Sequence, residues 1–294
     1  MKLTKIEKIS TKMGGSTLTK VARNHSIKHL SEFLRSNGRN MRDLSELKAR
    51  DVRLYVIEQQ QAGASKRTLQ NRLSHVRTAL REVGRHQLAN SPHLSCKTLG
   101  IDQASRNGTH QALSQAQYEK ALELAQRQDQ GFAACLALQR TLGLRAREAV
   151  QCSASLKGWE RALERGQPIR VLHGTKGGRP RDVGAVDQDM ALKAVKTALE
   201  ALKIGHGTNE CLVQSKTLQG AMRAFGRHCE AVGLVGEHAS HSLRCMYAQE
   251  RFAQHLQNLG DRREALAATS QDLGHGDGRG TYVAQVYLAR PASS

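Results

Sequence analysis

The sequence predicts a mostly α-helical protein of two domains that also contains one small antiparallel β-sheet. Three observations support this fold class. Apolar residues recur three and four positions apart over much of the 294 residues, which is the period of an amphipathic helix. Residues 168–186 break that period around a turn-rich centre, as a β-hairpin does. Residues 90–112 contain few periodic apolar positions, which is typical of a linker between domains.

We expect three regions along the chain. They are a basic N-terminal arm over residues 1–16, a helical domain over 17–105 and a larger domain over 106–294. Within the helical domain, the apolar period predicts a first helix over about 17–35 and a second over about 51–61, each followed by a glycine that ends it.

The third expected helix is the clearest in the sequence. It begins after Ser65, whose side chain suits the position that caps a helix. Its apolar stripe consists of Leu69, Leu73, Val76, Leu80 and Val83. Its basic side chains are Lys66, Arg67, Arg72, Arg77, Arg81 and Arg85. Such a charge run is usually a solvated face. The helix contains only one carboxylate, Glu82, which favours contact with the backbone of a nucleic acid.

In the larger domain, Ser114 is placed to cap a helix that runs to about residue 127. The nearly all-apolar run over 132–144 predicts a buried helix. Two short strands then flank the turn-rich segment 174–180. Helical patterns resume from about residue 187, and again over 216–232, 241–257 and 262–272.

The net charge of +19 and the isoelectric point near 10.1 indicate a polyanionic partner, and nucleic acid is the usual one. A ribosomal type of basic protein would share this charge. Residues 1–105 carry +12 of it and the remainder +7. The more basic first third suits a clamp on DNA.

The six cysteines form no C-x-x-C pair, and we expect reduced core thiols in a cytoplasmic protein. No apolar run follows the basic N-terminus, and no stretch approaches the ~20 apolar residues of a membrane span. We therefore expect no membrane contact. The sequence has no phosphate-binding P-loop, acidic metal cluster or zinc-ligand spacing, so neither a cofactor nor a metal is expected.

Five motifs stand in order along the chain, and the first four place phosphate-binding side chains ahead of the tyrosine in the fifth. They are Gly143-Leu144-Arg145, Thr175-Lys176-Gly177-Gly178, His241-Ser242-Leu243-Arg244, Leu273-Gly274-His275 and Val286-Tyr287-Leu288. Phosphodiester cleavage builds charge on the nonbridging oxygens, which preorganised guanidiniums stabilise. A phenol has a pKa near ~10 and must be activated by cations or a base before it attacks. Cationic groups followed by one phenol therefore suit phosphoryl transfer to tyrosine.

These motifs resemble those of the tyrosine recombinases, the phage-integrase family of site-specific DNA recombinases. The resemblance is strong over about 114–290 and looser over 17–90. It implies a helical core-binding domain and a catalytic domain that form a C-shaped clamp around DNA. It also implies cleavage and rejoining of DNA through a 3′-phosphotyrosyl intermediate, without metal or nucleotide, for the integration or excision of a mobile element.

The family's Gly-Leu-Arg-x-x-Glu pattern is matched through Glu148. It implies that Arg145, together with Arg244, contacts the scissile phosphate, and that Glu148 orients neighbouring groups. Arg147 is then expected to face solvent or the DNA backbone.

The resemblance makes Lys176, at the tip of the hairpin, the general acid for the leaving 5′ oxygen. Arg179 lies close by and is expected to contact DNA. His241 would accept a proton or bind the phosphate, and His275 would donate a hydrogen bond to it. Each residue, without the others, would more often be an ordinary surface side chain.

Two tyrosines compete for the role of nucleophile. The family usually places this tyrosine about nine residues after the last histidine, whereas Tyr282 and Tyr287 follow His275 by seven and twelve. A lengthened loop over 276–280 would bring Tyr287 into register, and we favour it. Tyr282 remains the alternative.

The resemblance further implies that the partners are double-stranded DNA sites and copies of the chain itself, from dimer to tetramer, with an accessory DNA-bending factor possible in principle. Seven residues follow Tyr287, too few for a long helix exchanged between protomers. Two alternatives remain open: a type IB topoisomerase that relaxes DNA without exchanging partners, and a DNA-binding protein without catalysis.

Overall fold

The computed structural model describes residues 14–41, 43–204, 211–276 and 278–289. Most of the expected basic arm and the last five residues therefore lie outside the described residues. The chain divides into two compact units between Ser105 and Arg106. Each unit has a hydrophobic core of its own and is described by itself.

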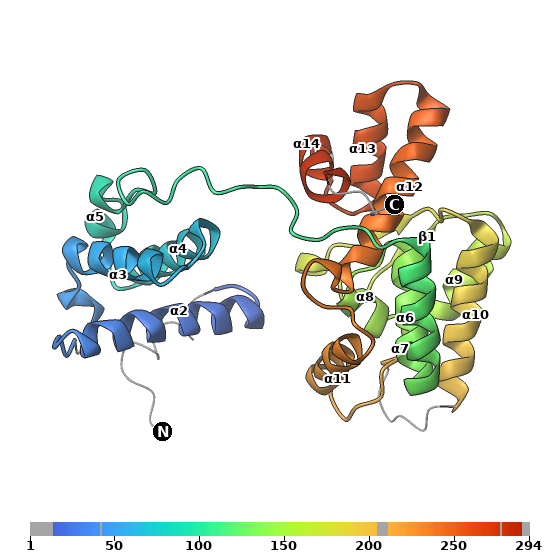
Figure 1. Ribbon diagram of the computed structural model, residues 1–294, viewed down its shortest axis with the longest axis horizontal. Coiled ribbons are helices and arrows are strands. Elements are labelled where there is room, and N and C mark those ends of the chain that lie inside the picture. Colours follow the sequence, from blue (N-terminus) through green and yellow to red (C-terminus); the bar gives the residue numbers. More distant parts are fainter. Residues whose placement is uncertain (1–13, 42, 205–210, 277, 290–294) are drawn as a thin grey trace. The chain divides into compact units, whose positions relative to one another are not determined.

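The first unit is helical (Figure 1). Its elements are α2 (Thr17–Ser36), η1 (Leu44–Glu46), α3 (Ala49–Gln61), α4 (Lys66–Glu82), α5 (His86–Ala89) and η2 (Pro92–Leu94). Helices α2, α3 and α4 pack on one another around a core that includes Ile27, Tyr55 and Leu69. Ser65 caps α4 as predicted, because its side chain accepts the backbone N–H of Thr68.

The first part of the predicted linker is packed rather than free. Leu94, Leu99 and Ile101 are buried in the core of the first unit. The prediction of a linker that starts at residue 90 is therefore wrong for this part. These three apolar residues are spaced too irregularly to show a helical period, so the sequence pattern gives no sign of their burial.

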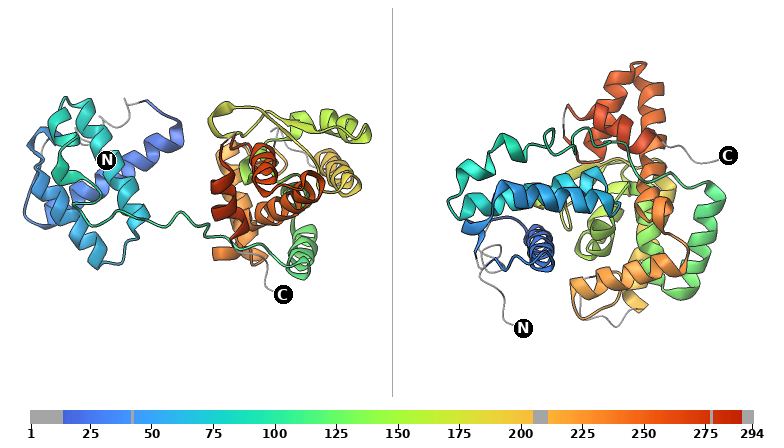
Figure 2. Two further views of the ribbon diagram at one scale, coloured as in Figure 1. Left: turned by 90° about the horizontal axis from the view of Figure 1, so that it is seen from above. Right: turned by 60° about the vertical axis from the view of Figure 1, so that its left-hand side comes forward.

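The second unit contains ten helices of α or π type within the described residues, with short 3₁₀ turns between some of them. Its elements are α6 (Gln115–Gln128), α7 (Gln130–Leu142), α8 (Ala146–Val150), η3 (Ser153–Ser155), α9 (Leu156–Glu164), β1 (Ile169–Val171), η4 (Lys176–Gly178), β2 (Arg181–Val183), α10 (Gln188–Ile204), α11 (Leu218–Ala231), η5 (Gly236–His238), α12 (His241–Leu259), α13 (Arg262–Asp272), α14 (Gly280–Val283) and the π-helix η6 (Ala284–Leu288). Helix α7 is almost wholly buried, as its apolar sequence predicts, and packs against α6, α10 and α12. Helices α12 and α13 lie side by side (Figure 2).

The predicted hairpin is present. Strands β1 and β2 are antiparallel, with Ile169 opposite Val183 and Val171 opposite Arg181. These four residues are the buried positions of the two strands. The prediction of a mostly helical fold with one small antiparallel sheet is confirmed.

Four of the six cysteines are buried and two, Cys96 and Cys211, are half-buried, and all six are free thiols. Among the described residues, no helix combines the length and the apolar character that crossing a membrane requires.

Candidate active site

The site begins where α7 ends and α8 starts. Arg145 stands at the N-cap of α8 in an extended conformation, and its backbone N–H donates to Glu148 Oε2 at 2.7 Å. Its Nη1 donates to Glu148 Oε1 at 2.7 Å. This double contact fixes the Arg145 guanidinium while leaving the side chain partly exposed. Arg147, two residues on, is exposed as expected.

Glu148 is fully buried, with 0% exposure, and accepts hydrogen bonds from two arginines, Arg145 and Arg181. Arg181 on β2 binds it with both terminal nitrogens, Nη2 lying 2.7 Å from Oε2. Burial alone would raise the pKa of Glu148, but the hydrogen bonds and charge of Arg181, followed by the charges of Arg145 and Arg244, lower it to about 2. Two guanidiniums therefore bind this carboxylate and the charge of a third, that of Arg244, acts on it, which leaves a net positive charge that suits a phosphate.

Arg244, one turn into α12, is the centre of the site and is completely buried. Its Nη1 donates to the carbonyl of Gly143, its Nη2 donates to the carbonyl of Leu273, and its Nε donates to Tyr287 Oη at 3.3 Å. A guanidinium has five N–H donors, so within the described part of the chain two remain for another acceptor.

The C-terminal end of α13 supplies the acceptors that hold these arginines. The carbonyl of Leu273 accepts from both Arg145 and Arg244, and the carbonyl of Asp272 accepts from Arg181 at 3.3 Å. Helix ends leave such carbonyls unpaired. The next residue, Gly274, has a φ of +64°, and a Cβ there would collide with Cδ of Arg181. Only glycine permits this turn beside the arginine.

Asp272 is also held from its side chain. Arg251 Nε donates to its Oδ2 at 2.8 Å, and His255 Nε2 lies 2.9 Å from the same oxygen. Both partners project from α12. The end of α13 is therefore tied to α12 on one side and to the arginines of the site on the other.

Tyr287 lies inside the π-helix η6 and is 3% exposed. Its Oη is 3.0 Å from His275 Nε2 and 3.3 Å from Arg244 Nε. Single π-helical turns are rare overall, but those that occur are often at functional sites. The extra residue in such a turn changes which side chain faces inward. Here the turn brings the phenol to Arg244.

Both site histidines are held neutral. Burial, followed by the charges of Arg244, Arg145, Arg181 and Lys176, lowers the pKa of His275 to about 3. Burial is also the largest cause that lowers the pKa of His241 to about 3, and the charges of Arg244, His110 and Arg145 contribute in that order. A neutral imidazole has one nitrogen that accepts a hydrogen bond. The His241 ring packs against Tyr287 with 5.6 Å between ring centroids.

Tyr282 occupies a different place. It is 37% exposed and meets the His275 ring edge-on at 4.8 Å between centroids. Burial, followed by the charge of Tyr287, raises the pKa of Tyr282. Of the two tyrosines, Tyr287 is the one whose Oη is hydrogen-bonded to Arg244 and His275.

Lys176 and Arg179 lie at the turn of the hairpin, where both are exposed. Lys176 shares no hydrogen bond or ion pair with the other candidate residues in the part of the chain that the structure describes, although its charge acts on His275. The structure thus brings together five of the six candidate catalytic residues and leaves the sixth on the adjacent turn.

The basic residues expected on the third helix make different contacts, and the last of them, Arg85, lies beyond α4, which ends at Glu82. Arg77 and Arg85 donate to backbone carbonyls of Leu94 and of the η1 turn, and Arg81 donates to Asn90 Oδ1. Arg72 binds Gln59, and Arg67 donates to the carbonyl of Ser105. The remaining one, Lys66, is exposed at the start of the helix. Several of these cations therefore help to hold the first unit together.

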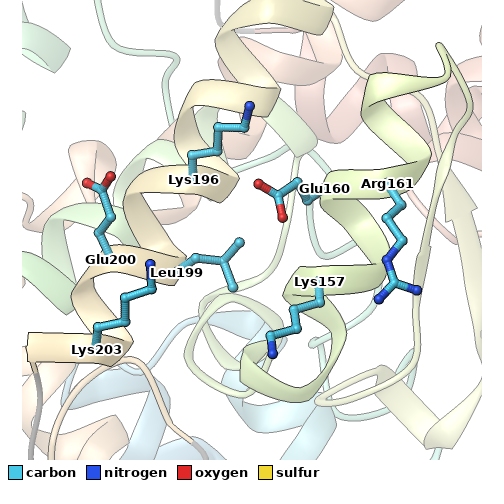
Figure 3. Close-up of a pocket in the computed structure, with 7 residues that line it drawn as sticks. All are labelled: Lys157, Glu160, Arg161, Lys196, Leu199, Glu200 and Lys203. Carbon is cyan, nitrogen blue, oxygen red and sulfur yellow. The ribbon is translucent and has the colours of Figure 1, made fainter.

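A separate pocket of about 340 Å³ lies on the surface of the second unit. Figure 3 shows its lining side chains on α9 and α10, which are Lys157, Glu160, Arg161, Lys196, Leu199, Glu200 and Lys203. None of the candidate catalytic residues lines it. It mixes cations with carboxylates on an open surface and has no bearing on the tyrosine site.

Sequence reasoning missed the role of Arg181. The signal that could have found it is the alternation of β2, which puts Arg181 on the same face as Val183 and therefore toward the core. A buried arginine needs an acidic partner. Glu148 was available for that role.

Comparisons with known proteins agree with this geometry. A family model described as Integrase matches residues 100–250, and a model described as Phage integrase, N-terminal, matches residues 2–89. The chain therefore belongs to the phage integrase family, the tyrosine recombinases. By class it is a site-specific recombinase.

Solved structures share the fold. A lambda integrase dimer bound to a COC′ core site is 16% identical, with a TM-score of 0.65 over 98% of this chain and 77% of that one. The integrase of the transposon Tn1549, in complex with transposon right end DNA, is also 16% identical, with a TM-score of 0.63 over 96% and 94%. A lambda integrase tetramer bound to a Holliday junction is 17% identical, with a TM-score of 0.60 over 95% and 74%. No curated protein matches the chain.

Proposed function

We propose that the chain cleaves and rejoins double-stranded DNA at specific sites through a 3′-phosphotyrosyl intermediate on Tyr287, in the integration or excision of a mobile element. The observation that carries this proposal is the position of Tyr287 Oη, within hydrogen-bonding distance of both Arg244 and His275. A phenol in this position has a cation to stabilise its anion and a neutral base to take its proton.

The residues divide the reaction between them. Arg244 Nε can only donate, so the phenol hydrogen is free to point at His275 Nε2, which takes it once the bound phosphate anion has raised the pKa of His275. Arg145 and the two spare donors of Arg244 bind the nonbridging oxygens of the phosphate. Lys176 gives a proton to the 5′ oxygen as the phosphorus–oxygen bond breaks and the bond to Tyr287 forms.

Binding of DNA has to rearrange this site. Tyr287 is 3% exposed, and its Oη occupies the side of Arg244 where Nε would otherwise be free. Arg145 is the more accessible of the two phosphate-binding arginines. We infer that the phosphate meets Arg145 first and that the phenol then gives up its contact with Arg244 to attack.

The proposed DNA contacts follow from charge and exposure. Lys66 on α4 and Arg179 on the hairpin are exposed cations, and the chain carries +19 overall. The lambda and Tn1549 integrase structures contain DNA, and the lambda structures are a dimer and a tetramer. We propose that this chain likewise acts on DNA as an assembly of its own copies.

The test is to trap the covalent intermediate. Nicked duplexes, first selected for binding by the full chain from a randomised library, would lose a short strand after cleavage and leave the protein attached. Wild type and Tyr282→Phe should form the adduct, whereas Tyr287→Phe should bind the same DNA and form none. An adduct lost only in Tyr282→Phe would identify Tyr282 as the nucleophile. Binding without any adduct would indicate a DNA-binding protein without catalysis.

A further inference from the structure

The segment Gly108–Gln111 is tied to the active site at both of its ends. Gly108 N–H donates to the carbonyl of Gln285 at 2.9 Å, and Gln111 N–H donates to the carbonyl of Glu237 at 2.9 Å. Gln285 belongs to the π-helix that carries Tyr287, and Glu237 belongs to η5, which immediately precedes α12. The segment is therefore a strap across the two elements that place Tyr287 and His241.

Gly108 makes a close approach possible at one end of the strap. A Cβ at this position would collide with the carbonyl oxygen of Val286, the residue before Tyr287. Glycine is the residue that allows one backbone to lie directly on another. The strap thus rests on the backbone of the π-helix itself, and this contact fixes how far the strap lies from Tyr287.

His110 lies between the two anchors and faces His241. The two ring centroids are 5.1 Å apart, and the His241 ring is in turn 5.6 Å from that of Tyr287. Nδ1 of His110 is buried and has no hydrogen-bond partner among the described residues. A buried polar atom without a partner is costly and therefore calls for an explanation.

Among the described residues, the groups that face His241 are cationic or uncharged. They are Arg244 on its own helix, Arg145 at the start of α8, His110 on the strap and the ring of Tyr287 on the π-helix. Protonation of His241 would place another positive charge among them. Burial is the largest cause that lowers the pKa of His241, and the charges of Arg244, His110 and Arg145 lower it further.

We propose that His110 is a positioning residue of the active site, which holds the His241 ring against Tyr287 during cleavage. The strap Gly108–Gln111 then does more than connect the two units, because it supplies one wall of the catalytic centre. This inference rests on the proposed cleavage through Tyr287.

The experiment measures adduct formation by the full chain in a single turnover, on the selected nicked duplexes, from about pH 4 to about pH 9. The bound phosphate is an anion and raises the pKa of both His275 and His241, which brings the acid-side fall in rate, to which both imidazoles contribute, into this range. His110→Ala should cleave about tenfold or more slowly near neutral pH, because the His241 ring is no longer held. Its acid-side fall should also move to higher pH, because one of the causes that lower the pKa of His241 is gone.

His110→Phe separates packing from charge. It keeps a ring against His241, so its rate on the alkaline side should recover toward wild type while the acid-side fall stays at the higher pH. The control is His93→Ala, an exposed histidine of η2, whose profile should match wild type. Band shifts on the same duplexes report DNA affinity for each variant.

Two results would overturn the inference while leaving the proposed function intact. In one, His110→Ala cleaves with the wild-type rate and profile. In the other, both His110 variants lose rate by the same factor at every pH, which a merely structural role would produce. If wild type forms no adduct at any pH on DNA that it binds, both this inference and the proposed function fail.

Discussion

The change Glu148→Gln keeps the shape of a buried side chain and removes its charge. Glu148 accepts hydrogen bonds from Arg145 and Arg181, and it has no solvent to replace them. A glutamine turns one of its two acceptor oxygens into a donor, which then faces a guanidinium. We therefore expect a less stable second unit and a misplaced Arg145.

The magnitude follows from the pKa of Glu148, which falls from its ordinary 4.5 to about 2 on folding. At about 1.4 kcal/mol for each factor of ten, this corresponds to roughly 3 kcal/mol of stability at neutral pH. Breaking a buried ion pair from one side costs a similar amount, about 3–5 kcal/mol. Because the folded-state pKa is depressed, the contribution is complete above pH 4.5 and is lost as the pH falls toward 2.

The assay is thermal and urea unfolding of the full chain with and without the change. Glu148→Gln should lower the melting temperature of the second unit by about 6–12 °C at neutral pH, and the difference from wild type should shrink as the pH falls below 4.5. The matched control is Glu123→Gln, which removes an exposed ion pair with Arg127 and should cost at most about 1 kcal/mol. If both variants unfold like wild type, Glu148 does not hold the arginines as described.

Three further changes test other parts of the account. Lys176→Ala should slow cleavage by about 10²–10⁴-fold on ordinary DNA and far less on DNA whose leaving 5′ oxygen is replaced by sulfur, a leaving group that needs no acid; equal losses on both substrates would exclude it as the general acid. Gly274→Ala should cost about 1–3 kcal/mol in thermal unfolding, because the turn is left-handed and crowded, and an unchanged melting temperature would contradict this. The double change Lys66→Ala with Arg67→Ala should reduce the slope of log DNA affinity against log salt concentration by about 2 in a binding titration. Arg85→Ala should lower the stability of the first unit and leave that slope unchanged. If Arg85→Ala reduced the slope and the double change did not, the DNA-binding side chains of this region would be different ones.

Much of the fold could be predicted because the period of apolar residues marks most of the helices in the sequence. The apolar stripe of α4 and the all-apolar α7 bury the side that the period indicates. The hairpin was visible from its turn residues. The packing of Leu99 and Ile101 was not visible, because irregular segments that cover a core leave no periodic trace.

The candidate site could be predicted only as a set of residue types in order. Sequence spacing left Tyr282 and Tyr287 open, since a π-helical turn that carries Tyr287 to Arg244 has no recognisable pattern. The role of Arg181 depends on a contact between residues 33 positions apart. The acceptor role of the Leu273 carbonyl depends on backbone geometry, which no side-chain motif encodes.

The most direct test of the central claim is to locate the DNA on the protein. The tryptic peptide that begins at Gly280 contains both Tyr282 and Tyr287, so fragmentation of this peptide by tandem mass spectrometry, after nuclease treatment of the trapped adduct, distinguishes the two. The account predicts a nucleotide phosphate on Tyr287, the residue beside Arg244 and His275. A phosphate on Tyr282, or on any other residue, would contradict it.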